Sequence, residues 1–398
     1  MIITVNSAQS LTSALNSAKS GDTILLEAGN YSNVQIRGVA FNGGVTIASK
    51  DPGNPATLTG LVVNNSQGLS FQNLHLDFSS PWTVWNAQIV NSKNIEFNNF
   101  DIHGSLNNNP ADDRSALLIS NSTGVKITGS QFHELAHGVS MMNSNDVRIE
   151  GNTFREIRSD GVMSAGTSHV QVVGNTFTNF YPATGDHPDA IQFLTRGTTS
   201  QAHDILVSGN LITRGDGGII QGVFITDQVG LGYERVTVSD NVVIGGMYNG
   251  IMVARANNLV INGNIVASYG DQKSWIRVTD SSHAQMMDNQ ALTYVLEGNS
   301  NLVTKGDAVL QPLSASIIAN LSKWLAGVSG DKATMELVGG IDDYQLQYLS
   351  HGRVEIISAW GHGETSGVGY LHFADELHSR LVAADAGQPF AQIGDDAG

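Results

Sequence analysis

A repeated segment ending in Gly-Asn constrains the fold of this chain more than any other feature. Val147-Arg-Ile-Glu-Gly-Asn152-Thr-Phe154 and Val170-Gln-Val-Val-Gly-Asn175-Thr-Phe177 share alternating apolar residues, a turn and a second short apolar run. Spacings run from 22 residues (Ser130 to Asn152) to 35 (Asn175 to Asn210). This pattern predicts stacked β coils carrying loops of variable length, with a ladder of mutually hydrogen-bonded turn residues. The ladder positions are Leu74, Phe100, Ser130, Asn152, Asn175, Asn210, Asn241, Asn264 and Asn289.

A second column of polar residues precedes the ladder, at the start of another strand in each coil. In five coils it stands 15 residues before the ladder, as from His137 to Asn152 and from Asp160 to Asn175. Side chains alternate along a strand, so every second residue after the column faces the core and the others face outward. The column is Ser115, His137, Asp160, Asp189, Gln221, Asn249 and Ser274. The expected inward residues are Val139, Val162, Ile191, Val223, Ile251 and Ile276, and the outward ones are Ser140, Met163, Gln192, Phe224, Met252 and Arg277.

Insertions surround the middle coils. The distance from column to ladder grows to 21 residues after Asp189 (to Asn210) and to 20 after Gln221 (to Asn241). Because neighbouring coils stack about 4.8 Å apart, loops on both sides of one sheet predict a groove across the strands, suited to an extended polymer. The inserted segments are about 103–114, 178–188 and 213–220 before the strands, and 194–204 and 226–234 after them.

Composition and charge restrict the partners. The formal net charge of −16, with 20 Lys and Arg, argues against nucleic acid, because phosphate contacts require clustered cations. An anionic polymer would need a local basic groove or a bound cation. No apolar stretch is long enough to predict a membrane span, and Met1-Ile-Ile-Thr-Val5 lacks the features of a signal peptide. The absence of cysteine excludes disulfides and is compatible with a secreted bacterial protein as well as a cytosolic one.

Two regions are expected: residues 1–304 as the β coils and 305–398 as a small α+β or β domain. Within Ser7 to Ser20, Leu11, Leu15 and Ala18 have helical spacing and predict a capping helix for the first coil.

After about Thr304 the repeat fades. Ser314 to Gly327 has the spacing of a helix stopped by glycine, and Trp360-Gly-His-Gly-Glu364 is predicted to be a turn rather than a site. Strands are predicted at Thr334 to Val338, Tyr344 to Leu349, Val354 to Ala359 and Val368 to Phe373.

Two early segments carry a family resemblance. Gly21-Asp-Thr-Ile-Leu-Leu-Glu-Ala-Gly-Asn-Tyr31, followed by Gly44-Val-Thr-Ile-Ala-Ser-Lys-Asp-Pro-Gly53, resembles the opening of the pectate-lyase-like β-helix proteins, nearest to the chondroitinase-B and alginate-lyase type. The resemblance covers about the first eighty residues. It implies an all-β fold, a single-stranded right-handed parallel β-helix, and a polysaccharide substrate. We therefore expect an extracellular or secreted bacterial or phage protein.

Paired acids in the column suggest catalysis. Asp160 and Asp189 occupy the same position in consecutive coils, so their carboxylates are expected roughly 5 Å apart. That spacing is near the separation in retaining glycosidases, and like charges so close would raise the pKa of one. His137 precedes Asp160 by one coil, and Asp216 lies on the next inserted loop. A plain column of turn-forming residues before glycine is the alternative.

The same acids could hold a metal. Asp186 and His187 stand just before Asp189 on the loop that begins at Tyr181. Carboxylate oxygens of Asp160, Asp186 and Asp189 are the ligand type that Ca²⁺ favours. The sequence requires no cofactor. Ca²⁺ is a possible ligand of these three acids.

Cations downstream suggest elimination chemistry. A cation beside a uronate carboxylate acidifies the α-proton, which is the first requirement of β-elimination. The resemblance implies a lysine base and an assisting arginine; Arg255 stands at the coil position of the lysine and Arg277 near that of the arginine. A guanidinium is a poor base, so Lys273, Tyr248 or His187 would exchange the proton. Surface charges that merely balance an acidic chain are the alternative.

These observations predict a polysaccharide lyase acting on a uronate-containing polymer. The alternatives are a glycoside hydrolase using Asp160 and Asp189, a C5-epimerase, and a non-catalytic adhesin or tailspike-like glycan binder. Epimerase is the weaker alternative because His137-Gly-Val-Ser-Met-Met142 departs from the Tyr-Gly-Phe-Asp-Pro-His strand of that family. The candidate catalytic residues are Asp160, His187, Asp189, Tyr248 and Lys273. The candidate substrate-binding residues are His137, Tyr181, Gln192, Asp216, Arg255 and Arg277.

Overall fold

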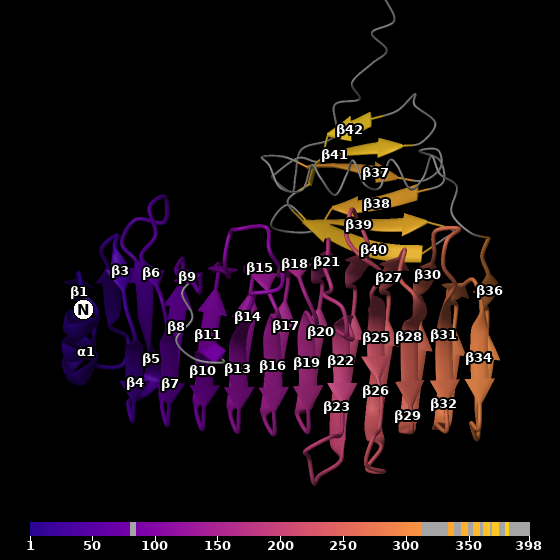
Figure 1. The fold of residues 1–398 in the computed structure, drawn as a ribbon, viewed down its shortest axis with the longest axis horizontal. Coiled ribbons are helices and arrows are strands. Elements are labelled where there is room, and N and C mark those ends of the chain that lie inside the picture. The colour runs from indigo at the N-terminus through magenta and orange to yellow at the C-terminus, as the bar shows by residue number, and fades with distance from the viewer. Residues whose placement is uncertain are drawn as a thin grey trace, which may run out of the picture.

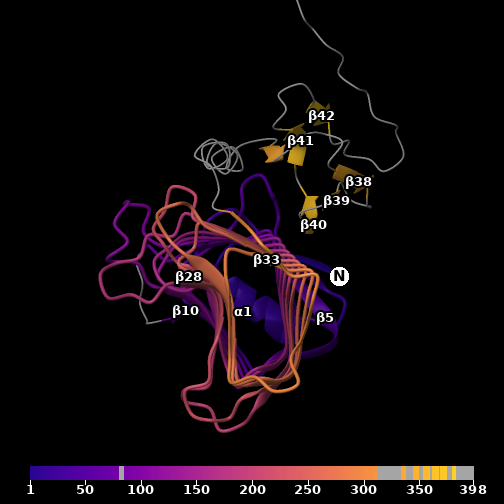
Figure 2. The same ribbon diagram turned by 90° about the vertical axis from the view of Figure 1, so that its right-hand side faces the viewer.

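The computed structural model describes residues 1–79 and 85–311, together with six strands between residues 333 and 381. Three parallel sheets of 13, 12 and 11 strands, here sheets A, B and C, form the first region. From β2 onward the chain visits sheets A, B and C in turn, so each strand pairs with its equivalents in the coils before and after. Figure 1 shows the coils side by side, and Figure 2 looks along the stack at the three sheets that enclose the core. The predicted parallel β-helix is confirmed.

The strands of the coils are short. Sheet A contains β1 (Ile2–Val5), β2 (Thr23–Leu26), β5 (Ala40–Ser49), β8 (Gln67–Gln72), β11 (Lys93–Asn98), β14 (Thr123–Thr128), β17 (Asn145–Glu150), β20 (Ser168–Val173), β23 (Ala202–Ser208), β26 (Tyr233–Ser239), β29 (Ala256–Asn262), β32 (Ser282–Met287) and β35 (Val303–Lys305). Sheet B contains β3 (Asn30–Tyr31), β6 (Thr57–Leu58), β9 (His75–Asp77), β12 (Asp101–His103), β15 (Gln131–Leu135), β18 (Thr153–Ile157), β21 (Thr176–Thr178), β24 (Leu211–Thr213), β27 (Val242–Ile244), β30 (Ile265–Ala267), β33 (Gln290–Ala291) and β36 (Ala308–Val309). Sheet C contains β4 (Val34–Arg37), β7 (Leu61–Asn64), β10 (Trp85–Val90), β13 (Ser115–Ser120), β16 (Val139–Met142), β19 (Val162–Ala165), β22 (Asp189–Leu194), β25 (Gln221–Ile225), β28 (Tyr248–Ala254), β31 (Ser274–Thr279) and β34 (Tyr294–Glu297).

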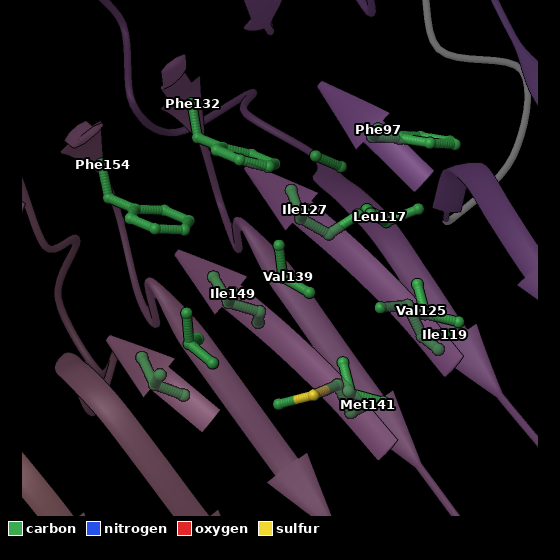
Figure 3. Close-up of a cluster of buried hydrophobic side chains, with 14 of the residues drawn as sticks. Phe97, Leu117, Ile119, Val125, Ile127, Phe132, Val139, Met141, Ile149 and Phe154 are labelled. Atoms are coloured by element: carbon green, nitrogen blue, oxygen red, sulfur yellow. The ribbon is translucent and has the colours of Figure 1, made fainter. Parts of the chain in front are cut away.

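The core lies inside the coils and is built by the alternation of each strand. Figure 3 shows inward side chains of neighbouring coils, such as Leu117 and Val139, packed against those of the other two sheets. On sheet B, Phe132, Phe154 and Phe177 stack with ring centroids 4.7 and 4.8 Å apart. Equivalent residues thus repeat the same contact from coil to coil, and this repetition fixes the register.

The asparagine ladder is confirmed. From Asn152 to Asn289 the side-chain oxygen accepts the backbone N–H of the ladder residue one coil earlier, as between Asn175 and Asn210 (2.9 Å) and between Asn210 and Asn241 (3.0 Å). The predicted positions Leu74 and Phe100 have no side-chain oxygen and do not accept such a bond. The amide nitrogens donate to backbone carbonyls within the stack, for example from Asn210 to Val172 (2.9 Å). Asp307 accepts in the same way from Asn289 at the last coil. These asparagines are therefore buried structural residues.

The predicted capping helix is α1 (Ala8–Ser17), at the N-terminal end of the stack (Figure 1). Ser7 caps it in a capping box with Ser10, and Leu11, Ala14 and Leu15 are buried. Within the part of the chain that is described, α1 is the only helix, and no helix there is long and apolar enough to cross a membrane.

Strands recur beyond residue 311. One three-stranded sheet contains β37 (Ala333–Leu337), β41 (Val368–Phe373) and β42 (Ser379–Leu381), and the other contains β38 (Tyr344–Tyr348), β39 (Arg353–Ser358) and β40 (Gly361–Ser366). The four predicted strands are confirmed. The predicted turn at 360–364 was wrong for residues 361–364, which pair in β40 with β39. The helix predicted over 314–327 lies outside the described residues.

Candidate active site

The polar column forms one edge of sheet C, as predicted. Asp189 pairs with Gln221, and the pairing of Val162 with Ile191 puts Asp160 beside Asp189. Loops 179–188, 214–220 and 268–273 lead into β22, β25 and β31, and loops 195–201 and 226–232 follow β22 and β25. In Figure 2 the two groups of loops leave the stack at the two edges of sheet C. The outer face of sheet C between them is the candidate site.

Asp189 and His187 form the centre of the site. His187 Nδ1 lies 3.1 Å from Asp189 Oδ2, and Gln221 Nε2 lies 2.9 Å from Asp189 Oδ1 and 3.1 Å from His187 Nε2. Gln192 also donates to the Asp189 carboxylate. The hydrogen bond to Asp189 raises the pKa of His187, and burial raises the pKa of Asp189. The pair is therefore arranged to share a proton.

Asp160 and His137 extend this cluster by two coils. Asp160 Oδ1 accepts the backbone N–H of Asp189 (3.2 Å), and its Oδ2 lies 3.7 Å from His137 Nε2. Burial, with the neighbouring charge of Asp189, raises the pKa of Asp160 to about 8. Burial also lowers the pKa of His137, whose Nδ1 lies 2.9 Å from Ser115 Oγ. Near neutral pH, Asp160 is thus an uncharged carboxylic acid beside a neutral imidazole.

The side chains of these residues differ in how much of their surface is exposed. The side chain of Asp189 is 0% exposed and that of Asp160 is 6% exposed, whereas that of His187 is 62% exposed. A group that attacks a sugar or removes its proton must touch it, so His187 can reach a polymer and Asp189 cannot. Asp189 contacts the imidazole from inside the protein, which is the arrangement of the acid and histidine in a catalytic triad.

Asp186 is held away from the other two acids. Its carboxylate lies 3.0 Å from Arg158 Nε and accepts the backbone N–H of Ala183 (2.9 Å). Among the residues that the structure describes, the groups whose ligand atoms lie within 4.8 Å of one another are His169-His203-Asp204 and His133-Glu134-Glu156. The structure therefore does not bring Asp160, Asp186 and Asp189 together as a ligand set for Ca²⁺.

Aromatic side chains continue the edge of sheet C. The rings of Tyr248 and Trp275 are 5.2 Å apart, and the indole N–H of Trp275 donates to Asn249 Oδ1 (2.9 Å). Asn249 in turn donates to Gln221. Phe224 lies under His187 with ring centroids 5.3 Å apart. Together these rings offer flat, half-exposed surfaces of the kind that sugar rings stack against.

The predicted cations lie at different places. Arg277 is on the outer face of sheet C and pairs with Glu297 (3.2 Å), while Lys273 is exposed just before β31. Arg255 follows the last residue of β28 and pairs with Asp227 (3.4 Å). Since Tyr248 begins that seven-residue strand, Arg255 is about 23 Å away, at the far edge of the sheet. Arg255 and Tyr248 are therefore not brought together.

Tyr181 and Asp216 stand on the loops before β22 and β25. Both are exposed, and burial together with the charges of Glu156 and Asp216 raises the pKa of Tyr181. Gln192 is half-buried on the outer face, as predicted. Ser140 was predicted to line the same face but is fully buried, so this face is covered at the coil of β16.

Three contributors were not among the candidate site residues. Gln221 and Asn249 were identified only as column members, and their amides connect Asp189 to Trp275. Arg158 was missed altogether. The sequence could have indicated it, because Arg158 stands two residues before the column residue Asp160, at the edge of the sheet where the inserted loops are predicted.

Solved structures of other proteins are similar to this chain at low sequence identity. The native GH136 lacto-N-biosidase from Eubacterium ramulus is similar at a TM-score of 0.51 and 11% identity, covering 78% of this chain and 68% of that chain. A family 28 exopolygalacturonase from Yersinia enterocolitica has a TM-score of 0.44 and 10% identity, and the match covers 79% of each chain. An alginate lyase from Paenibacillus sp. has a TM-score of 0.39 and 14% identity, and the match covers 78% of this chain and 99% of that chain.

Such low identities bear on the fold alone, although all three names describe carbohydrate-processing enzymes. Curated protein sequences give no match. The family described as right handed beta helix region matches residues 3–177 and, overlapping, 59–266. With more than half of its length matched and three parallel sheets wound around one core, this chain belongs to the right-handed β-helix family.

Proposed function

We propose that this protein cleaves a uronate-containing polysaccharide by β-elimination on the outer face of sheet C. The observation that carries the proposal is the pairing of an exposed imidazole, His187, with a fully buried carboxylate, Asp189, at 3.1 Å. That pairing suits the removal of a proton by a group that touches the substrate. We further propose that the protein meets this polymer outside the cytoplasm.

The reaction needs a base and a site that tolerates an anionic sugar. Once the substrate displaces the Gln221 amide from His187 Nε2, this nitrogen takes the proton from the carbon next to the uronate carboxylate. A double bond forms between that carbon and its neighbour in the ring, and the bond from this neighbour to the glycosidic oxygen breaks. Tyr248 and Lys273 are the exposed proton donors on the same edge for the leaving oxygen. With a pKa of about 8, Asp160 remains uncharged at neutral pH and adds no repulsion.

Substrate binding rests on the neighbouring coils. Phe224, Tyr248 and Trp275 supply stacking surfaces, and Arg277 supplies a positive charge three coils from Asp189. At about 4.8 Å per coil, this is roughly 14 Å along the stack, the length of about three sugar residues. A polymer lying across the strands would therefore contact His187 and Arg277 at the same time.

Hydrolysis by Asp160 and Asp189 is less well supported. A retaining glycosidase needs a carboxylate that attacks the sugar carbon, and Asp189 has no exposed surface. Epimerisation begins with the same proton removal as elimination, and the products distinguish the two reactions.

The test is an assay of the purified chain on acidic and neutral polysaccharides. Elimination gives both new reducing ends and the ultraviolet absorbance of an unsaturated uronate. His187→Ala should remove both signals, and the exposed histidine variant His283→Ala should keep them. New reducing ends without absorbance would exclude elimination, and binding with neither signal would favour a glycan-binding protein.

A further inference from the structure

A second cluster of chemically active side chains lies on the outer face of sheet A, on the opposite side of the core from the proposed active site. Val170 pairs with Ile205, so His169 in β20 stands beside Asp204 in β23. His203 Nδ1 lies 2.7 Å from Asp204 Oδ2, and His169 Nδ1 lies 3.4 Å from the same oxygen. The two imidazole rings meet edge to face, with centroids 4.9 Å apart.

A cavity opens beside this cluster. It has a volume of about 660 Å³ and is lined mainly by polar side chains. The side chains of His169, His203 and Asp204 are 50%, 38% and 32% exposed, so solvent reaches all three. Among the residues that line it are His169, Asp204 and Arg235.

We propose that His169, His203 and Asp204 bind a divalent transition metal ion of the zinc class. Two imidazoles and one carboxylate are the ligand types that Zn²⁺ takes in three-residue sites, with open positions left to water. Ligand atoms around a tetrahedral ion bound at about 2.0–2.1 Å are separated by roughly 3.3 Å. The two distances to Asp204 Oδ2 bracket that value, and all three ligand atoms lie within 4.8 Å of one another, so side-chain rotations would bring them around one ion.

Arg235 fixes the carboxylate for this role. Its Nε donates to Asp204 Oδ1 (2.7 Å) and its Nη2 to Oδ2 (2.9 Å). A metal ion replaces the contact at Oδ2, while the contact at Oδ1 continues to orient the carboxylate. Hydrogen bonds from outer residues commonly position metal-binding carboxylates in this way.

The other histidine–acid cluster lacks such an opening. Both ring nitrogens of His133 are already engaged, by Glu134 and by Asp101 (2.7 Å), and its side chain is 8% exposed. His133 is therefore less available to a metal ion than the histidines of the cluster on sheet A.

The test is calorimetric titration of the untagged, chelator-treated chain with ZnCl₂. One equivalent should bind. His169→Ala and His203→Ala should each weaken binding by more than the roughly 10–100-fold that loss of an outer partner costs. His283→Ala is the matched control, because His283 is an exposed histidine on the same sheet and, like His169, has a left-handed backbone.

Circular dichroism and the melting temperature without metal should be the same for all variants, which separates loss of the site from loss of the fold. CaCl₂ should give no binding, because imidazoles are poor ligands for Ca²⁺. Zinc binding that survives the double variant His169→Ala/His203→Ala, or the absence of zinc binding in the parent chain, would overturn the proposal.

Discussion

His187 Nδ1 lies 3.1 Å from Asp189 Oδ2, yet 62% of the histidine side chain is exposed and none of the aspartate. The carboxylate is held from three sides by His187, Gln192 and Gln221. A buried acid fixed in this way sets the orientation and charge of an exposed imidazole.

The pH dependence of cleavage should be bell-shaped. Because the pKa of His187 is raised by Asp189, the base is protonated and inactive at low pH, and activity should rise with pH above about 6.5. Above about 8, ionisation of Asp160 adds a negative charge next to the anionic substrate, so activity should fall. Initial rates from pH 5 to 10 on one polymer test this. A rate that increases steadily through pH 9 would contradict the role of Asp160.

Asp189→Asn should lower the catalytic constant by roughly 100- to 10,000-fold, as loss of the orienting acid does in a triad. The amide lacks the charge that raises the pKa of His187, so the acid limb of the profile should also move to lower pH. Both effects are measured in the same rate series. If Asp189 had only a structural role, the substitution would lower the rate without moving the acid limb of the pH profile.

Asp160→Asn should make the protein more stable near pH 8. The carboxyl group has a pKa of about 8 in the folded chain and an ordinary value of 3.8, so between these values unfolding releases a proton. The parent chain therefore loses stability as pH rises from about 4 to 8, on the order of a few kcal/mol. The amide does not ionise and can still accept the backbone N–H of Asp189.

Denaturant unfolding of parent and Asp160→Asn at pH 4.5 and pH 8 measures this difference. The advantage of the variant should be small at pH 4.5 and should grow toward pH 8. An advantage that does not change with pH would show that packing, not ionisation, is responsible.

Arg277→Ala should raise the Michaelis constant for an acidic polymer by about tenfold, since one charged contact is worth roughly 1–2 kcal/mol. Arg255→Ala is its control, because Arg255 lies at the far edge of the sheet and pairs with Asp227. It should change the Michaelis constant less than twofold. Equal effects of the two substitutions would mean that the polymer extends over the far edge.

Much of the fold was predictable because the coils repeat. A polar residue two positions before an inward apolar residue, as Asp160 before Val162 and Asp189 before Ile191, was enough to place Asp160 beside Asp189. The same count identified Val162 and Ile191 as core residues, which the structure confirms.

The site was less predictable because loops do not repeat. The path of the loop before β22 determines that Asp189 is buried and His187 is exposed. Since the loops that lead into sheet C differ in length from coil to coil, the repeat does not predict its path. The partnership of Arg158 with Asp186 likewise joins a strand end to this loop. The edge position of Arg255, in contrast, could have been foreseen from the length of β28.

The asparagine ladder has a consequence for how such a protein can change. Each rung satisfies the backbone of the previous coil from one fixed turn, as Asn210 does for Asn175. The corners that lead into sheet C carry no part of that chain of bonds, whereas the corners that follow it have a serine ladder of their own, as between Ser92 and Ser122. Segments at the corners before sheet C can therefore be lengthened, shortened or exchanged one at a time while the rungs keep their spacing. A library of loops inserted before β22 and β25 could alter which polymer is accepted while leaving the folded spine intact.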